Sequence, residues 1–232
     1  MIGIFGGTFD PIHFGHLRAA LDVHQTLGLG ELRLLPLNVP VHREQPVASA
    51  VHRLAMVEAA IGGEPGLRAD DREIARTGRS YSVDTLASLR TELGAKRPIC
   101  FLVGADAFSG FFDWHRPRDI LALAHLVVMQ RPGAPLPRDP ALRAELERRL
   151  TSDRRHLQQA PAGRIWVEEV TQLDISSTRI RRMLAAGASP RYLLPDAALA
   201  IARREACYSE RTVLGPSASN SDPPAQRGHD AA

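Results

Sequence analysis

The stretch GGTFDPIHFGH near the start of the chain combines residue types that suit the binding of phosphate groups. Gly6 and Gly7 permit positive backbone φ and let a ligand approach the main chain closely. The stretch then enters a helix from about His13, and the free N–H groups at a helix start attract anions. His13 and His16 are three positions apart, so both imidazoles lie on one face of the first helical turn. We therefore expect both histidines to point at one phosphate group.

Two other interpretations of this stretch compete with phosphate binding. One is a structural glycine turn with incidental histidines. This would explain a single histidine, but it explains less well the whole eleven-residue combination directly after a strand. The other is a metal site formed by Asp10, His13 and His16, but the sequence identifies no further ligand for zinc. The Gly-x-Gly-x-x-Gly and Gly-x4-Gly-Lys-Ser/Thr phosphate loops are absent from the stretch. The sequence therefore favours a phosphate site of another kind and no protein-bound metal.

A second stretch with phosphate-binding chemistry, ISSTRIRRML, lies near the other end of the chain. It places hydroxyl side chains at an expected helix start with guanidinium groups behind them: Ser176, Ser177, Thr178, Arg179, Arg181 and Arg182. Hydroxyls, free backbone N–H groups and guanidinium forks together suit a polyphosphate. Taken alone, an ordinary capped helix with a basic, solvent-facing side explains this pattern better. Its pairing with the first stretch favours a phosphate cradle.

The elements that must position these residues alternate between short apolar strands and amphipathic helices. Strands are expected at residues 1–5, 32–38, 98–104, 125–130 and 164–170, and helices from about residue 13 and at 48–62, 82–93 and 176–187. This alternation predicts an α/β fold, a doubly wound and mostly parallel sheet in a single domain. Such sheets bind ligands beyond the carboxyl ends of their strands, where GGTFDPIHFGH falls.

Composition limits the classes of partner. The chain has 232 residues, of which 44% are hydrophobic, so one sizeable core is expected. A net charge of +3 and a pI of about 9.3 suit an anionic ligand but do not call for nucleic acid, and 5% aromatic residues are too few for base-stacking platforms. There is no apolar run near eighteen residues and no leader pattern, and Cys100 lies in an apolar run. We expect a cytoplasmic protein.

The domain is expected to cover residues 1–205. Within it, residues 132–164 are rich in Pro, Arg and Glu and are interpreted as a surface excursion with one solvated helix. Residues 215–232 lack the apolar side chains that would compensate for ordering and are expected to be a disordered tail.

Taken together, these motifs resemble a known family. GGTFDPIHFGH with ISSTRIR is similar to the nucleotidyltransferase superfamily marked by His-x-Gly-His and Ile-Ser-Ser-Thr-x-Ile-Arg. TGRSYSVDTL (77–86), FLVGAD (101–106) with Trp114 after it, and NVPVHR (38–43) resemble the bacterial nicotinate-mononucleotide adenylyltransferases, over residues 1 to about 205. The resemblance implies a Rossmann-like nucleotidyltransferase fold. It also implies an enzyme of NAD biosynthesis that joins ATP and nicotinate mononucleotide to give nicotinate adenine dinucleotide and pyrophosphate, with Mg2+ carried by ATP.

The resemblance also implies roles for individual residues. Those expected to act in catalysis are His13, His16 and Arg179. Those expected to bind ATP are Gly6, Gly7, Thr8, Phe9, His13, His16, Gly104, Asp106, Ser176, Ser177, Thr178 and Arg179. Those expected to bind the mononucleotide are Asp10, His42, Arg43, Thr77, Ser80, Tyr81 and Trp114, with Trp114 stacking on the pyridine ring. The family more often has Pro-Pro-His-Lys where this chain has Pro40 to Arg43, so the geometry at Arg43 differs from the family pattern.

Other functions remain alternatives to this one. A related adenylyltransferase would use the same phosphate site on nicotinamide mononucleotide or phosphopantetheine. A non-catalytic nucleotide sensor would bind ATP without releasing pyrophosphate. A nucleic-acid-binding function rests only on pI and arginine content. The expected partners are ATP and nicotinate mononucleotide, with no nucleic acid and no membrane, and a homo-oligomer is left open.

Overall fold

The computed structural model describes residues 1–39, 45–76, 78–131, 133 and 139–214. Within these residues lies a six-stranded, fully parallel sheet with the strand order β3-β2-β1-β4-β5-β6. Its strands are β1 (Ile2–Gly7), β2 (Glu31–Pro36), β3 (Leu67–Ala69), β4 (Ile99–Gly104), β5 (His125–Gln130) and β6 (Ile165–Glu169). The chain builds β1 to β3 toward one edge and then crosses to β4 on the other side of β1. The predicted doubly wound sheet is confirmed, and the strand order reverses between β1 and β4.

Helices follow nearly every strand, as the alternating pattern predicts. They are α1 (Phe14–Leu27), α2 (Ala50–Ile61), α3 (Arg72–Ala75), α4 (Ser82–Leu93), α5 (Ala105–Phe108), the 3-10 turn η1 (Phe111–Asp113), α6 (Pro117–Leu123), α7 (Pro140–Arg149), α8 (Arg154–Gln159), α9 (Ser177–Ala185), α10 (Asp196–Arg204) and α11 (Glu210–Leu214). Among the helices described, none is both long and apolar enough to cross a membrane.

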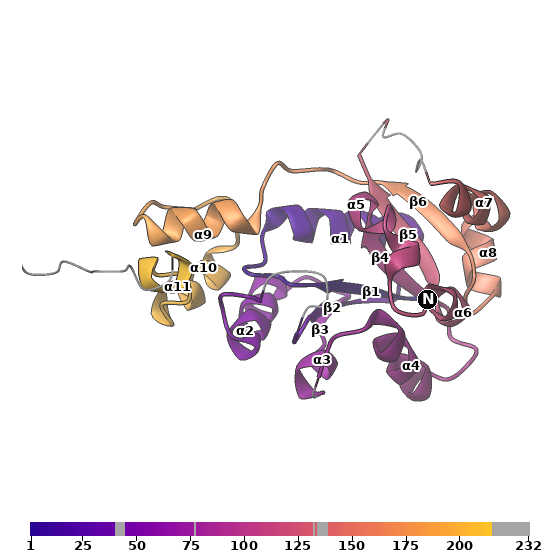
Figure 1. The fold of residues 1–232 in the computed structure, drawn as a ribbon, viewed down its shortest axis with the longest axis horizontal. Helices are drawn as coiled ribbons and strands as arrows, with labels where there is room; N and C mark the ends of the chain where they lie inside the picture. The colour runs from indigo at the N-terminus through magenta and orange to yellow at the C-terminus, as the bar shows by residue number, and fades with distance from the viewer. Residues whose placement is uncertain (40–44, 77, 132, 134–138, 215–232) are drawn as a thin grey trace, which may run out of the picture.

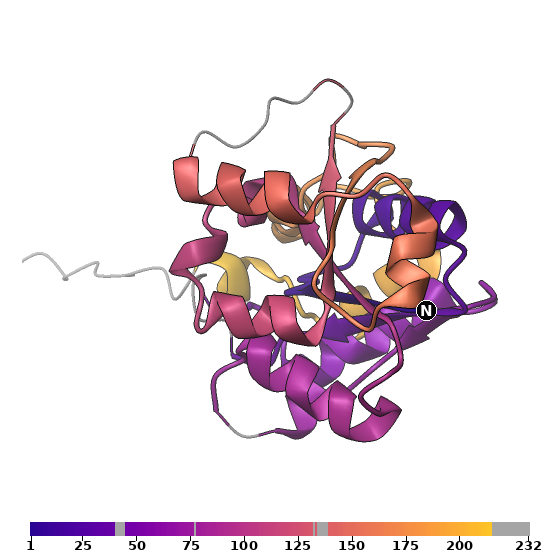
Figure 2. The ribbon, with the colours of Figure 1, turned by 90° about the vertical axis from the view of Figure 1, so that its right-hand side faces the viewer.

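The sheet is covered on both faces, and its strands alternate between two apolar clusters. Ile4 packs toward α4, α5 and α6, whereas Phe5 packs toward α1, α2 and α10. Figure 1 shows α1 on one side of the strands and α4 on the other, and Figure 2 shows helices on both sides. Because side chains alternate along a strand, a run buried on both faces must be apolar throughout. This explains the uniform composition of β4 and β5.

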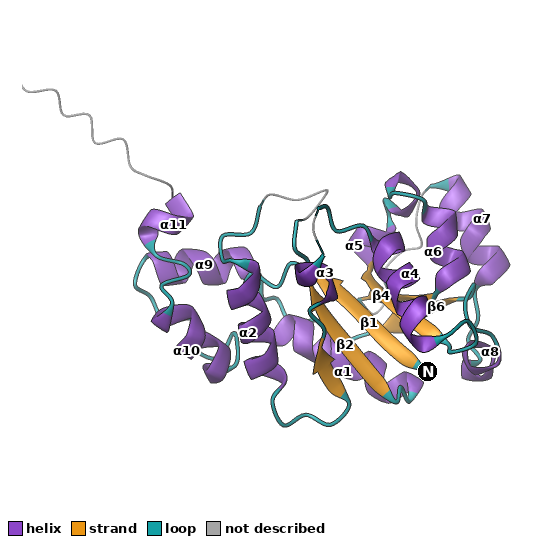
Figure 3. Ribbon diagram, turned by 90° about the horizontal axis from the view of Figure 1, so that it is seen from below, coloured by secondary structure: helices purple, strands orange, loops and turns teal. Residues whose placement is uncertain are grey.

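The C-terminal helices lie at the carboxyl end of β1. In Figures 1 and 3, α9, α10 and α11 form a group with α2, at the end of the molecule away from the N-terminus. β1 runs from the N-terminus toward this group. Residues from both ends of the chain therefore meet where β1 ends.

Two sequence expectations differ from the structure. Residues 139–164 contain two helices, α7 and α8, and each is anchored by buried leucines, Leu142 and Leu146 in α7 and Leu157 in α8. The expectation of a single solvated helix is therefore wrong. The few leucines that anchor these helices stand among many charged residues, so the segment has little apolar pattern in sequence. The folded part also continues past residue 205, since Cys207 and Tyr208 are buried. The expected tail, 215–232, lies outside the described residues.

Candidate active site

Hydrogen bonds join the two stretches that the sequence predicts to bind phosphate. The Ser177 hydroxyl donates to the carbonyl oxygen of Pro11 at 2.9 Å, and Nη1 of Arg181 donates to the carbonyl oxygen of Asp10 at 2.8 Å. We call residues 6–16 together with residues 176–181 the phosphate corner. The predicted pairing of the two motifs in one place is thus seen directly in these contacts.

The corner lies at the reversal of strand order. The pairing of β1 with β4 ends at Phe5 and Leu102, so Gly7 and Gly104 each lie two residues beyond the last pair. Doubly wound sheets bind ligands where neighbouring strands lead away in opposite directions. Gly104 ends β4 and is followed by α5, in which Asp106 is exposed. Both residues therefore lie on the edge of the sheet that carries the corner.

The two histidines of the corner lie against each other. Their rings are stacked with centroids 3.8 Å apart and an interplanar angle of 24°. His13 is the N-cap of α1, and a Cβ atom added at Gly15 would lie 3.0 Å from the His13 ring. Glycine at the third position of His-x-Gly-His therefore lets the first imidazole lie flat on the helix start. The two imidazoles thus lie together at the start of α1, with His13 at the N-cap and His16 in the first turn.

Burial controls the protonation of His13. The residue is 5% exposed, and this burial lowers the pKa of His13 to about 4. His13 is therefore neutral at pH 7 and acts there as a hydrogen-bonding group rather than as a cation. Its Nδ1 and the hydroxyl of Thr8 are buried without a hydrogen-bond partner in the part of the chain that the structure describes. Such atoms are the kind that a bound ligand satisfies.

Phe9 has a packing role. It is 1% exposed, and its ring makes edge contacts with Phe5 and His16 at centroid distances of 5.5 and 5.1 Å. A Cβ atom at Gly7 would lie 2.7 Å from the Phe9 ring. Glycine at position 7 is therefore required by the packing of this ring. Because the Phe9 side chain is inside the core, only the backbone of Phe9 could lie along a nucleotide as expected.

Asp10 also differs from the expectation that it binds the mononucleotide. Its carboxylate is 4% exposed and accepts hydrogen bonds from the backbone N–H groups of Val47 and Ala48 and from the Tyr208 hydroxyl. The carboxylate therefore faces the protein interior, where its oxygens are engaged by the chain itself. Arg181 lies 3.7 Å from the same carboxylate. The structure thus gives Asp10 an internal role that its place in the motif did not reveal.

The residues of the second motif, at the start of α9, make different contacts. Ser176 caps the helix, its hydroxyl accepting from the backbone N–H of Arg179 at 3.2 Å. Thr178 and Arg179 are exposed. Arg181 is only 19% exposed in its side chain and reaches the corner through Asp10 and, at 3.4 Å, the Thr178 hydroxyl. Arg181 belongs to the expected phosphate cradle but not to the residue roles taken from the resemblance, although in Ile-Ser-Ser-Thr-x-Ile-Arg it is the specified arginine and Arg179 is the unspecified residue.

A second cluster gathers the residues expected to read the nicotinate ring. The ring of Tyr81, which precedes α4, lies 4.4 Å from that of His115. Trp114 is half-buried, with centroids 5.7 Å from Phe111 and 6.3 Å from Phe101. Trp114 therefore packs on the core and also lies next to the aromatic contact of Tyr81. The contact of His115 with Tyr81 is not predicted by the sequence, in which His115 is distinguished only by its position beside Trp114.

Hydrogen bonds attach the loop that contains Ser80 to the segment after β2. The Ser80 hydroxyl accepts from the backbone N–H of Asn38 at 3.0 Å, and the Ser80 N–H donates to the carbonyl oxygen of Val39 at 3.0 Å. Burial raises the pKa of Glu73, and hydrogen bonds with the Thr85 and Ser80 hydroxyls offset part of this rise. The remaining expected residues of this cluster, His42, Arg43 and Thr77, lie outside the described residues.

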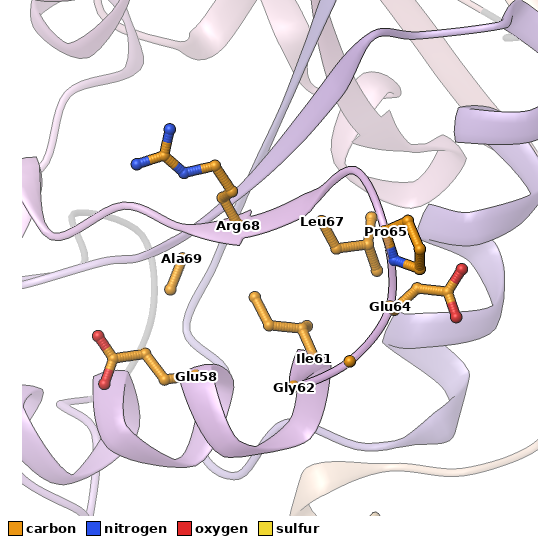
Figure 4. A pocket seen from close by; sticks show the side chains of 9 residues that line it. Glu58, Ile61, Gly62, Glu64, Pro65, Leu67, Arg68 and Ala69 are labelled. Carbon is orange, nitrogen blue, oxygen red and sulfur yellow. The ribbon is translucent and has the colours of Figure 1, made fainter.

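Other features of the surface do not coincide with the corner. A surface hollow of about 480 Å³ lies between α2 and β3 and is lined by residues that include Glu58, Ile61, Pro65 and Arg68 (Figure 4). This hollow is lined by the loop that precedes β3, whereas the phosphate corner lies where β1 ends. Among the described residues, no group of three or more His, Cys, Asp or Glu side chains is placed to hold a metal ion.

Comparisons with known proteins extend over nearly the whole chain. Residues 4–183 match the family model described as "Cytidylyltransferase-like". The chain is 50% identical over 211 residues to a protein of Methylococcus capsulatus, covering 90% of this chain and 100% of that one. It is 45% identical over 212 residues to a protein of Marinobacter nauticus, covering 91% and 98%. Both relatives are named "Probable nicotinate-nucleotide adenylyltransferase".

Solved structures show the same fold at low sequence identity. The Plasmodium falciparum nicotinic acid mononucleotide adenylyltransferase complexed with NaAD aligns with a TM-score of 0.66 at 16% identity, covering 89% of this chain and 96% of that one. A putative nicotinate-nucleotide adenylyltransferase of Vibrio parahaemolyticus aligns with a TM-score of 0.59 at 17% identity, covering 90% and 95%. The solved structures thus agree with the sequence relatives, and the two motifs meet at the carboxyl end of β1. The family model and the relatives show that the chain belongs to the cytidylyltransferase-like family and, within it, to the nicotinate-nucleotide adenylyltransferases.

Proposed function

We propose that the protein transfers the adenylyl group of ATP to nicotinate mononucleotide, releasing pyrophosphate, as a step of NAD biosynthesis. The observation that carries this proposal is the junction of the two motifs, in which α9 contacts the turn before His13 through Ser177 and Arg181. The relatives at 45% to 50% identity support the choice of substrate through their names.

The proposed reaction is an in-line displacement at the α-phosphate of ATP. An oxygen of the mononucleotide phosphate forms the new P–O bond while the bond to the departing pyrophosphate breaks. The attacking phosphate is already anionic at neutral pH, so no general base is needed. The protein contributes positioning and the stabilisation of charge on the α-phosphate and the leaving group. Mg2+ bound to the ATP phosphates would offset part of their charge.

We assign the triphosphate to the phosphate corner. We assign to His16, in the first turn of α1, a hydrogen bond to the α-phosphate, and neutral His13 stacked beside it offers a buried nitrogen without a hydrogen-bond partner among the described residues. Arg181 joins Arg179 as a candidate to stabilise the charge of the departing pyrophosphate. The lower exposure of Arg181 and its contact with the turn at Asp10 favour Arg181 for this role. Gly6, Thr8, Gly104, Asp106, Ser176 and Thr178 remain predicted ATP contacts.

We assign the nicotinate ring to the aromatic cluster around Tyr81 and Trp114. A half-buried indole offers a flat apolar face to a pyridine ring, and the polar loop before α4 offers donors to a carboxylate. His42, Arg43 and Thr77 remain predicted contacts of the mononucleotide.

The test is pyrophosphate release from ATP and Mg2+ with one second substrate at a time. Turnover with nicotinate mononucleotide far above that with nicotinamide mononucleotide or phosphopantetheine is expected. Equal turnover with both pyridine nucleotides would keep the chemistry and reject the carboxylate-reading role of the loop before α4. ATP binding without pyrophosphate release from any substrate would favour a nucleotide sensor instead.

A further inference from the structure

A buried arginine outside both expected substrate sites contacts three separate backbone segments. Arg53, in α2, is 1% exposed. Its Nη1 donates to the carbonyl oxygen of Thr8 at 2.8 Å, its Nε to that of Ala48 at 3.2 Å, and its Nη2 to that of Asn38 at 3.5 Å. Every acceptor is a main-chain carbonyl, so this side chain acts on the protein itself.

These three segments belong to different parts of the site. Thr8 lies in the phosphate corner. Asn38 donates its backbone N–H to the Ser80 hydroxyl, and its side chain donates to the Arg76 carbonyl at 3.2 Å, so it holds the loop of the mononucleotide side. One guanidinium therefore reaches the supports of both substrate sites.

Arg53 and the Asp10 carboxylate meet at one residue, since the carbonyl oxygen of Ala48 accepts from Arg53 and its N–H donates to Asp10. The same carboxylate also lies 3.7 Å from Arg181. Burial lowers the pKa of Arg53, and the Asp10 charge offsets part of this shift. The Tyr208 hydroxyl donates to Oδ1 of Asp10 at 2.8 Å, and burial, followed by the Asp10 charge, strongly raises the pKa of Tyr208. The phenol thus stays protonated and remains a donor. We call Asp10, Arg53 and Tyr208 the buried clamp.

We propose that the buried clamp is a set of positioning residues that couples the ATP site to the mononucleotide site. Burying a guanidinium and a carboxylate costs more desolvation energy than apolar residues of the same size would, so packing alone does not explain them here. A fork that fixes three carbonyls is a task that an apolar side chain cannot perform. This inference rests on the proposed function.

Arg53→Lys tests the fork directly, because it keeps the positive charge and loses the three-way geometry. We expect the KM values for ATP and for nicotinate mononucleotide each to rise by about tenfold, the loss expected for a buried, charge-assisted hydrogen bond. The assay is run well below the unfolding temperature, with the fold checked by circular dichroism. A lower Tm with both KM values and kcat unchanged would reduce Arg53 to a structural residue and overturn the proposal.

Tyr208→Phe is the second variant, since it removes one hydroxyl and leaves the ring packed. The matched control is Tyr192→Phe, because Tyr192 is 83% exposed. We expect Tyr208→Phe to weaken the binding of both substrates several-fold and the control to leave it unchanged. An effect of equal size in both variants, or none in Tyr208→Phe, would contradict the clamp even if Arg53→Lys does not fold.

Equilibrium titrations of the same proteins with ATP and with nicotinate mononucleotide separate this inference from the proposed function. A wild-type protein that binds both nucleotides but releases no pyrophosphate would overturn the proposed function alone, and the Kd values would still judge the clamp. An active wild type with unchanged Kd and KM values in both variants would overturn the clamp alone.

Discussion

The Ser177 hydroxyl and the Pro11 carbonyl oxygen lie 2.9 Å apart although 166 positions separate the two residues in sequence. This contact attaches the first turn of α9 to the loop that leads into His13. The histidine motif and the hydroxyl motif therefore form one structural unit, and each supplies part of the frame of the other.

Replacement of His16 tests the catalytic assignment. His16→Ala removes the imidazole at the first turn of α1, where we place the α-phosphate. We expect kcat to fall by about 10²-fold to 10³-fold, the cost of losing one donor to a developing charge. Steady-state pyrophosphate release measures it, and thermal unfolding checks the fold. His24→Ala, eight residues along the same helix, is the control and should retain the wild-type rate. A near-normal rate for His16→Ala would remove this residue from the mechanism.

The two arginines of α9 can be separated by a matched pair of variants. Arg181 contacts the turn at Asp10, whereas Arg179 is exposed. We expect Arg181→Met to lower kcat/KM for ATP by about 10²-fold and Arg179→Met to lower it by less than about tenfold, since a charge-assisted contact to phosphate is the stronger when partly buried. A larger loss in Arg179→Met would restore the expectation from the sequence.

Trp114 is the test of the mononucleotide site. Trp114→Ala removes the indole face next to Tyr81, and we expect the KM for nicotinate mononucleotide to rise by about tenfold or more while the KM for ATP changes little, given that stacking is worth about 0.5 to 1.5 kcal/mol beyond area burial. Trp166→Ala is the control, because Trp166 lies in β6. Equal changes in both KM values of Trp114→Ala would count against this placement.

His13 makes stability depend on pH. Its folded pKa of about 4 lies below the ordinary 6.5, so between these values the unfolded chain binds a proton that the folded chain does not. The stability contributed by neutral His13 is complete above pH 6.5 and is lost as the pH falls toward 4. The full effect is about 3 kcal/mol. Urea unfolding at pH 7.5 and pH 4.5 measures it.

The control for this pH dependence is His13→Gln, which removes the titrating ring. Burial also lowers the pKa of His125, with the same sign, and that residue is present in both proteins. The variant should therefore lose less stability on acidification than the wild type. Identical losses would show that His13 does not titrate with the shifted pKa.

Most of the sheet could be predicted from the sequence, because β4 and β5 are uniformly apolar runs between helical patterns. β3 could not, since Leu67–Ala69 is only three residues long and contains a charged arginine. α10 was missed as well: its sequence, DAALAIARR, is rich in alanine and carries few large apolar side chains, and the burial of Ala198, Leu199 and Ala202 is seen only in the fold. Such elements are defined by their tertiary neighbours rather than by their own composition.

The site was predicted at the level of motifs and less well at the level of atoms. Residue types and spacing showed that the histidines share a helical turn, which is a local property. They could not show that Asp10 faces inward, because its partners Val47, Ala48 and Tyr208 are 37 to 198 positions away. Arg53 carries no local signal at all, and only the three carbonyls around it reveal its place.

The hydrogen bond from Tyr208 to Asp10 also sets an order of events during synthesis. Asp10 is synthesised before its partner Tyr208, which lies 198 positions later in the sequence. A nascent chain that has completed every strand of the described sheet still lacks both α9 and Tyr208. The contacts that join Asp10 and Pro11 to Ser177, Arg181 and Tyr208 can therefore form only after the C-terminal helices have been translated.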